Sequence, residues 1–505
     1  MSNRLVNTRR NIVWGTLNKL IAIALPFLVR TTLIYQLGIQ YVGISGLFAS
    51  ILQVLSLADL GFANAIVYSM YKPLAHGDND TVGALLGFYK KIYRVVGAVI
   101  LIVGLLIVPF INYLVKGSYP ADINIQLIYL IYLANTVVSY FLFAYKRSLL
   151  LASQRKDISD NIDSVVRIIL SGLQILLLFL FPDFYVFALV IPCMTILNNV
   201  FNEIVTKKNY NYIVENSNLD KKVKQEIIEK TKGLFVYKVC AITRNSLDNI
   251  FISTFLGIST VGIYSNYYYI MISVKGFLDV VSTGMSASVG HSVATESVEK
   301  NHRDLENLTF GFSWLATWFM TCLLCLFQPF MLLWVGQANI LPFSVVVALC
   351  FYFYVLAAGD MRSQYIDASG LWDKEKLRSI AETVGNVVLN YILIQFLGVL
   401  GIVLATALTI LFIGIPWSTK IVFDNYFKNG YKKYLWNQAV YAIVTIIVAS
   451  ITYLICTLVG GNNIVVLIIR GIICLFVPNI LYYLFFLKNE KTRLFFKIIK
   501  SKLLK

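Results

Sequence analysis

The sequence predicts an all-α polytopic membrane protein with about fourteen transmembrane helices. Hydrophobic residues make up 58% of the 505-residue chain, and the mean hydropathy is +0.73. A soluble chain of this length cannot bury so much apolar surface, so the bilayer must act as its solvent. Apolar runs such as Val95 to Val108 are unbroken, whereas strands of a transmembrane barrel have about ten residues of alternating polarity. The predicted spans are therefore helices.

The predicted spans follow one another along the chain with short connections. A hydrocarbon core about 30 Å thick requires roughly 20 apolar residues in a helix. Windows of this kind begin near residues 12, 42, 92, 122, 161, 184 and 234, and then near residues 261, 311, 341, 377, 400, 432 and 463. Ala22 and Ala24 in the first run resemble a signal-peptide cleavage site. The run continues for another turn and contains charges, so we expect it to be retained.

Basic residues in the loops predict the orientation, because Lys and Arg in short loops stay on the cytoplasmic side. Arg4, Arg9 and Arg10 precede the first span, and the even-numbered loops contain Lys90, Lys91, Arg155, Lys156, Lys207, Lys208, Arg303, Lys374, Lys376, Lys428 and Lys432. The odd-numbered loops contribute only Lys116. We expect both termini in the cytoplasm. The net charge of +17 reflects this topology and favours attraction to anionic membrane lipids. The basic residues are scattered over many loops, which argues against a nucleic-acid partner.

An internal similarity predicts a duplication. Residues 37–44 and 256–263 are identical at six of eight positions, and each segment lies at a predicted outer turn. The offset covers an even number of spans, so two six-helix lobes would be related by a pseudo-two-fold axis along the membrane normal. Coincidence between two apolar, glycine-containing turns is the alternative. The predicted organisation is an N-terminal lobe (1–206), a cytoplasmic linker with an amphipathic helix (207–233), a C-terminal lobe (234–425), and a peripheral helix pair with a basic tail (426–505).

Cations inside the spans are the candidate binding groups, because an ionisable side chain there costs at least about 2.5 to 3.5 kcal/mol and normally faces a cavity or a partner. Lys19 and Arg30 are eleven residues apart, which places them on nearly one helix face and about 16 Å apart along the axis, with Pro26 between them. Arg244 and Lys275 are expected near the midplane. Together these four cations suit phosphate or pyrophosphate.

An alternative reading of the second-lobe cations is that they only neutralise carboxylates one turn away. Arg244 precedes Asp248 by four residues, and Lys275 precedes Asp279 by four. Asp248 and Asp279, together with Asp59 and Asp360, are candidates for ion coupling or gating. Tyr264, Tyr267 and Tyr268 are candidate sugar contacts, although tyrosines in a membrane helix also serve packing or interface anchoring.

Enzymatic and metal chemistry have little support in the sequence. There is no phosphate-binding GxxxxGK[ST] loop, and no predicted outer loop exceeds about ten residues, so no catalytic residues are assigned. Cys322 and Cys325 have CxxC spacing, but without a second pair or a nearby histidine we interpret them as packing residues. No cofactor and no metal are expected.

Several short motifs resemble one transporter family. They are Asn11, Trp14 and Gly15, the segment 35–38 (YQLG), Gly43, the segment 57–62 (LADLGF) and the segment 261–265 (VGIYS). With the topology and the cations, they resemble the polysaccharide transporter family, the Wzx-type repeat-unit flippases of the multidrug/oligosaccharidyl-lipid/polysaccharide exporter superfamily. The resemblance covers almost the whole chain.

The resemblance implies a bacterial cell-membrane protein with two lobes and alternating access. It also implies export of an undecaprenyl-pyrophosphate-linked oligosaccharide from the inner to the outer leaflet for capsule, exopolysaccharide or O-antigen assembly. The family's cavity cations carry over as Arg30, Lys19 and Lys275. A polysaccharide polymerase and assembly proteins are the implied partners, and a monomer is expected because one chain contains both lobes.

Three alternatives remain open at this stage. A lipid II flippase for peptidoglycan shares the extra helices after residue 432. A drug/cation antiporter of the same superfamily would require acidic or aromatic groups where this chain has Arg30, Arg244 and Lys275. A membrane polysaccharide polymerase, from a different functional class, would need a large outer loop or an acidic catalytic motif.

Overall fold

The computed structural model describes residues 2–56, 62–117, 119–216 and 218–493, and this described part of the chain contains helices and no strands. The predicted all-α class is confirmed. The chain divides into two compact units, Met1–Gly262 and Ile263–Lys505. The division lies in the first turns of α11 (Ile258–Thr295), a helix that continues from one unit into the other.

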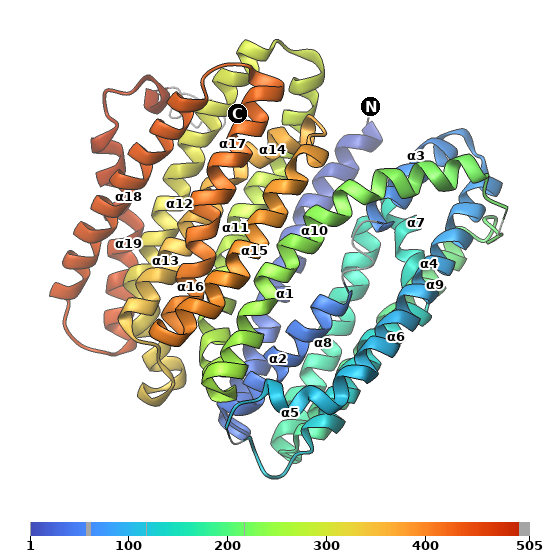
Figure 1. The fold of residues 1–505 in the computed structure, drawn as a ribbon, viewed down its shortest axis with the longest axis horizontal. Helices are drawn as coiled ribbons and strands as arrows, with labels where there is room; N and C mark the ends of the chain where they lie inside the picture. The colour runs from blue at the N-terminus through green and yellow to red at the C-terminus, as the bar shows by residue number, and fades with distance from the viewer. Residues whose placement is uncertain (1, 57–61, 118, 217, 494–505) are drawn as a thin grey trace. The chain divides into compact units, whose positions relative to one another are not determined.

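The first unit is a bundle of helices. Its elements are α1 (Ser2–Gln36), α2 (Ile39–Leu55), α3 (Phe62–His76), α4 (Asn79–Ile107), α5 (Ile111–Leu114), α6 (Ile125–Phe141), α7 (Arg147–Ala152), α8 (Lys156–Leu180), α9 (Phe184–Asn209), α10 (Lys221–Leu256) and the start of α11. Within it α1 packs on α8, α4 on α6, α9 on α6 and α8, and α10 on α2 (Figure 1). A bend of 51° separates α6 from the helix that contains α7.

The second unit continues α11 and adds the C-terminal helices. They are α12 (Val298–Val335), α13 (Phe343–Ala358), α14 (Asp360–Ala368), α15 (Trp372–Leu397), α16 (Val399–Thr409), α17 (Ile415–Val422), α18 (Tyr431–Leu458) and α19 (Ile464–Phe485). The long α12 packs against α13, α18 and α19, and α16 packs against α13 and α15. In Figure 1, α18 and α19 lie side by side at the end of the colour scale, next to α12.

The described helices include eleven that are long and apolar enough to cross a membrane, or up to twelve if the bent α6–α7 pair is one span. The protein is therefore a multi-pass membrane protein. Every predicted span start lies inside a helix or at most three residues before one. The predicted total of fourteen is not confirmed: α2 is apolar but shorter than a full span, and α10 is not among the helices that qualify in the described part of the chain.

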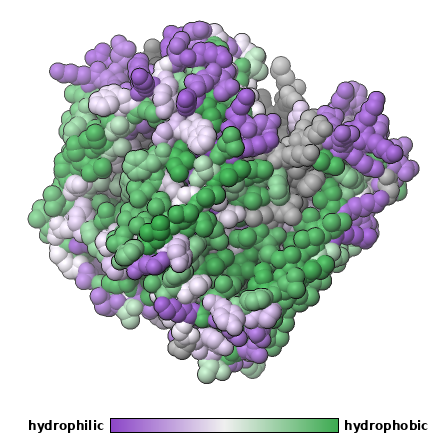
Figure 2. Space-filling model, viewed as in Figure 1, coloured by the Kyte–Doolittle hydropathy of each residue, from purple (hydrophilic) through white to green (hydrophobic). Residues whose placement is uncertain are grey.

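Side chains on the flanks of the helices agree with a lipid environment. Figure 2 shows hydrophobic side chains along the helices and hydrophilic side chains gathered at their ends. On α18 and α19, Ile443, Leu454, Leu458, Ile468 and Phe476 are 56–84% exposed. Apolar surface of this extent would be unfavourable in water, so it faces acyl chains.

The amphipathic segment predicted as a linker is part of a longer helix. It begins at the N-cap Asp220, whose carboxylate accepts from the backbone N–H of Lys222, and α10 then runs without a break to Leu256. Ile227 is 2% exposed and packs with Val223 in the core formed by α3, α4 and α7. Ile228 is 41% exposed. The predicted lobe boundaries stay predictions, and α10 packs on α2, α3 and α5 of the first unit.

The two similar turns have the same backbone conformation. Gly38 and Gly257 precede α2 and α11 with φ values of 117° and 95°, a region that glycine tolerates without steric cost. Near the second turn, the Lys116 ammonium donates to the carbonyl of Phe255 at 2.7 Å. A cation at the C-terminal end of α10 is favourable because unpaired carbonyls carry partial negative charge there.

The turns also pack on each other in a reciprocal way. A Cβ atom on Gly43 would lie 2.1 Å from the carbonyl oxygen of Ile258, and a Cβ on Gly262 would lie 2.3 Å from the carbonyl oxygen of Ile39. Ile39 and Ile258 are the equivalent first residues of α2 and α11, and Gly43 and Gly262 are the equivalent glycines. Such exchange of equivalent contacts is what a local two-fold axis produces, so the geometry supports the internal duplication at this point.

Candidate functional site

Lys275 is a buried cation within the apolar helix α11. Its residue is 8% exposed, and its ammonium lies 2.5 Å from the carboxylate of Asp279, one turn further along α11. It also lies 2.7 Å from the carboxylate of Asp360. Asp360 is the first residue of α14, directly after the break that ends α13 at Gly359. The helix break thus places a second carboxylate beside the lysine.

The three groups form one charge cluster, which we call the Lys275 cluster. With both carboxylates ionised, its net charge is −1. The ammonium has three donors, of which Asp279 and Asp360 occupy two. The Asp279 side chain is 56% exposed and that of Asp360 is 20% exposed. Asp279 is therefore the carboxylate that can leave the lysine at the lower cost, and an anionic ligand would compete for the position it occupies.

A second buried charge network joins α15 to α17. Arg378 pairs with Glu375 at 2.5 Å and also contacts Glu382, and the two glutamates are 1% and 2% exposed. The hydroxyl of Ser418 donates to Glu375 at 2.9 Å. Glu375 and Arg378 lie at the start of the span predicted near residue 377, and the sequence analysis assigned no role to them or to Glu382. The signal that was available is the spacing of three and four residues from Arg378 to its two partners.

The first-span cations share one unbroken helix. Lys19 is exposed and Arg30 is half-buried, and both lie in α1, which continues through Pro26. Asn18, next to Lys19, donates to Asn161 of α8 at 3.0 Å. This partly buried amide contact helps to fix the rotation of α1 on α8 at the level of Lys19.

Arg244 and its neighbouring acid lie on α10. Arg244 is half-buried, whereas Asp248 is 2% exposed. One residue further on, the Asn249 amide donates to the hydroxyl of Ser50 at 2.8 Å and holds α10 on α2. Asp59, the remaining candidate for coupling, lies outside the described residues.

The candidate tyrosines are held mainly by packing. Tyr264 and Tyr267 are at most 2% exposed. The Tyr267 hydroxyl donates to Gln328 at 2.7 Å and accepts from the backbone N–H of Leu341 at 3.2 Å. Tyr268 is half-buried and stacks on Tyr264 with 5.8 Å between ring centroids. Among the three, Tyr268 has the most accessible surface for a sugar ring.

A charge network in the first unit was missed by sequence reasoning. Lys146, which is 8% exposed, lies 2.6 Å from Glu203 and 3.0 Å from Glu215. Glu215 also pairs with Lys90 at 2.8 Å. Burial raises the pKa of Glu215, but hydrogen bonds from Lys90, Lys146 and Tyr145 outweigh it and leave that pKa below its ordinary value. The partners lie 57 and 69 positions from Lys146, so no local spacing pointed to them.

A cavity of about 490 Å³ adjoins this network. Its polar lining includes Lys146, Thr206, Lys207 and Glu215. Lys207 pairs with Glu203 at 3.0 Å, so the cations at this cavity already have carboxylate partners. We interpret the network as an anchor that holds the segment 210–216 against α4 and α9.

Three buried thiols lie close together at a place where the sequence analysis expected no metal site. Within the described ranges, Cys325, Cys456 and Cys474 form a buried group whose thiols could ligate one ion. Cys325 belongs to the CxxC pair interpreted as packing, and helix packing brings the other two thiols to it.

Comparisons with known proteins show likeness at the level of structure. No family model matches the sequence, and no curated protein matches it. The structure is similar to the lipid II flippase MurJ in an inward closed conformation, with a TM-score of 0.68 and 14% identity over 94% of this chain and 98% of that one.

Two multidrug transporters are similar as well. An inward-facing MATE family transporter of the MOP superfamily matches with a TM-score of 0.61 and 15% identity, over 79% of this chain and 94% of that one. A MATE transporter from Vibrio cholerae matches with a TM-score of 0.58 and 13% identity, over 85% of this chain and 100% of that one. All three are transporters or flippases. The chain therefore has the fold of the transporters of the MOP superfamily.

Proposed function

We propose that this protein is a flippase that moves an undecaprenyl-pyrophosphate-linked oligosaccharide repeat unit from the inner to the outer leaflet by alternating access. Its product would feed capsule, exopolysaccharide or O-antigen assembly. We place it in the bacterial cell membrane with both termini cytoplasmic, acting as a monomer beside a polysaccharide polymerase and assembly proteins. The transporter fold and the multi-pass topology support this proposal.

The observation that carries the proposal is the buried Lys275 within an apolar helix. A charge in such a position costs at least about 2.5 to 3.5 kcal/mol, and intramembrane charges of this kind usually mark a substrate or ion pathway. The half-buried Arg30 and Arg244 and the exposed Lys19 add cations to the spans of the first unit. Cations suit the pyrophosphate that joins lipid to sugar, and guanidinium groups can bind it bidentately.

The Lys275 cluster supplies a means of binding and release. When a pyrophosphate oxygen replaces the carboxylate of Asp279 at the lysine, the ammonium keeps its number of hydrogen bonds and the desolvation cost stays low. Protonation of Asp279 or Asp360 removes a competing negative charge and strengthens binding of the anion. An inside-negative membrane potential favours the outward movement of one negative charge by about 2.3 kcal/mol per 100 mV.

Lipid II is the second candidate substrate. The similarity to the lipid II flippase MurJ covers 94% of this chain, and the part left uncovered is shorter than α18 and α19 together, so the match includes at least part of this helix pair. The inward-facing MATE transporter covers 79% of this chain, and the uncovered part is longer than α18 and α19 together. Lipid II carries the same polyprenyl pyrophosphate, so the proposed role of Lys275 applies to either substrate.

The test measures lipid-linked oligosaccharide on the inner leaflet of cells that lack the protein. Cells complemented with wild type should clear the intermediate, whereas Arg244→Ala with Lys275→Ala should leave it in place. Because loss of Lys275 leaves two carboxylates unpaired, the double variant is repeated with Asp279→Asn and Asp360→Asn, which removes their charge. Lys300→Ala is the control, since the half-exposed Lys300 pairs with Glu296, one helical turn away, at the start of α12.

Each outcome has a separate meaning. Normal export without the protein contradicts the flippase proposal. Full rescue by the stably expressed double variant contradicts the cation site and leaves the flippase proposal standing. Accumulation of lipid II in place of the oligosaccharide intermediate assigns the second candidate.

A further inference from the structure

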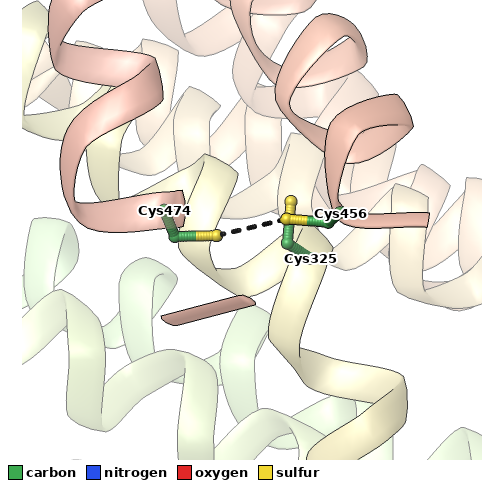
Figure 3. A group of neighbouring side chains, drawn as sticks. All are labelled: Cys325, Cys456 and Cys474. Atoms are coloured by element: carbon green, nitrogen blue, oxygen red, sulfur yellow. Dashed lines mark hydrogen bonds between the residues drawn. The ribbon is translucent and has the colours of Figure 1, made fainter. Parts of the chain in front are cut away.

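Three cysteine side chains from three helices meet inside the second unit. Cys325 comes from α12, Cys456 from α18 and Cys474 from α19, and each residue is at most 2% exposed. Their sulfur atoms all lie within 4.8 Å of one another, and those of Cys456 and Cys474 are 4.0 Å apart. Figure 3 shows the three side chains pointing toward one another from separate helices. We call them the thiol group.

A fourth cysteine borders the thiol group. Cys322 lies one turn before Cys325 on α12 and packs against the group. Its sulfur is 3.8 Å from the carbonyl oxygen of Cys474. The CxxC spacing puts both α12 thiols on the side of that helix that α18 and α19 cover.

The sulfur separations fit a metal–thiolate site. Metal–sulfur bonds of about 2.3 Å place neighbouring sulfur ligands roughly 3.8 Å apart in a tetrahedral arrangement and roughly 4.0 Å apart in a trigonal one. The 4.0 Å between Cys456 and Cys474 is within this range. The other two separations are at most 4.8 Å, so the three thiols are close enough together to ligate one ion.

The electrostatic surroundings also favour thiolates. Arg470 lies one turn before Cys474 on α19, and its Nη2 donates to the carbonyl of Val459 at 2.8 Å. Its Nε is buried and has no hydrogen-bond partner among the described residues. The sequence has no Asp or Glu between Asp424 and Glu490, so α18 and α19 contain no carboxylate to pair with this guanidinium. A thiolate complex with net negative charge would compensate it.

We propose that the thiol group binds one soft d¹⁰ metal ion, Zn(II) or Cu(I), and thereby fastens α18 and α19 to α12. Thiolates select such ions over hard cations. On binding, each ligating thiol releases its proton to the solvent and its sulfur donates an electron pair to the metal. Three thiolates suffice for Cu(I). Zn(II) prefers four ligands, and Cys322 is the thiol placed to be the fourth.

Metal analysis of the full-length protein tests the proposal. The protein is purified in detergent under anaerobic, reducing conditions, exposed separately to Zn(II) and to Cu(I), and freed of excess metal before elemental analysis. We expect about one ion per chain for at least one metal, and X-ray absorption should give metal–sulfur distances of about 2.3 Å. The metal that survives competition with a calibrated chelator identifies the ion.

Variants separate this site from other thiols. Cys474→Ser should weaken metal binding at least tenfold, because one ligand is lost. Arg470→Gln should weaken metal binding by about tenfold, because the positive charge beside the thiolates is lost. Cys350→Ser is the matched control, because Cys350 is a buried thiol of the same unit outside the group and its loss should leave binding unchanged. Folding of each variant is checked by size-exclusion chromatography.

Further measurements on the wild-type protein keep the proposal falsifiable if a variant misfolds. Bound metal should protect Cys325, Cys456 and Cys474 from alkylation in the partly denatured protein. Absence of both metals from the wild type, equal loss in Cys350→Ser, or a disulfide between Cys456 and Cys474 in protein isolated without reductant would each overturn the proposal.

Discussion

Replacement of Gly43 by alanine is the sharpest test of the packing between the two similar turns. The new Cβ would lie 2.1 Å from the carbonyl oxygen of Ile258 and 3.1 Å from the backbone nitrogen of Gly262. Ordinary contact begins at 3.4 Å, and the blocking atoms are backbone that cannot rotate away. The start of α2 must therefore separate from the start of α11 by about 1.3 Å, the difference between 3.4 Å and 2.1 Å. Overpacking of this kind costs about 1–3 kcal/mol, occasionally more.

The expected net effect follows from two opposing terms. Alanine has the better helix propensity, which returns at most about 1 kcal/mol. We take the upper end of the overpacking range, so the free energy of unfolding should fall by about 2 kcal/mol. Gly262→Ala should give a similar loss, because its Cβ would meet the carbonyl oxygen of Ile39 at 2.3 Å. The double variant should lose less than the sum, since one separation of the helices relieves both clashes.

The assay is equilibrium unfolding in detergent micelles, with thermal unfolding as a second measure. Gly172→Ala is the control, because Gly172 lies inside α8 and a Cβ there meets nothing within 4 Å. The control should be neutral or more stable by up to about 1 kcal/mol. Equal stability of Gly43→Ala and Gly172→Ala would refute the close approach of α2 and α11.

Two further predictions concern the charge network of the first unit. Lys146→Met leaves Glu203 and Glu215 without their shared buried cation, and loss of one partner of a buried pair costs about 3–5 kcal/mol. Lys433→Met should cost about 0–1 kcal/mol, because the Lys433 side chain is 70% exposed and its partner Glu306 keeps its pair with Lys491. Equal losses of the two variants in unfolding experiments would contradict the assignment. Because the pKa of Glu215 is lower in the folded protein, its pairing with Lys90 stabilises the fold at neutral pH, and this contribution is lost as the pH falls through the folded pKa. The unfolding midpoint of Glu215→Gln should depend less on pH in the acidic range than that of wild type, and parallel pH profiles would contradict this.

Local patterns in the sequence predicted parts of the candidate site. The spacing from Lys275 to Asp279 indicated a pair one helical turn apart, and that pair is present. Asp360 is 85 positions from Lys275, and the break between α13 and α14 that brings it there has no signal in hydropathy. Hydropathy measures the polarity of a window, so it cannot report which side chains of different helices meet.

The sequence by itself determined the all-α class and the positions of the apolar helices, because each span must satisfy its own backbone hydrogen bonds in lipid and therefore shows as a continuous apolar run. It also determined the similarity of residues 37–44 and 256–263. Only the tertiary structure decided that Gly43 and Gly262 pack against each other's helix starts, and that Cys456 and Cys474 join Cys325. These contacts depend on the rotation and depth of each helix against its neighbours. Close packing fixes those two quantities, and a one-dimensional pattern of polarity does not contain them.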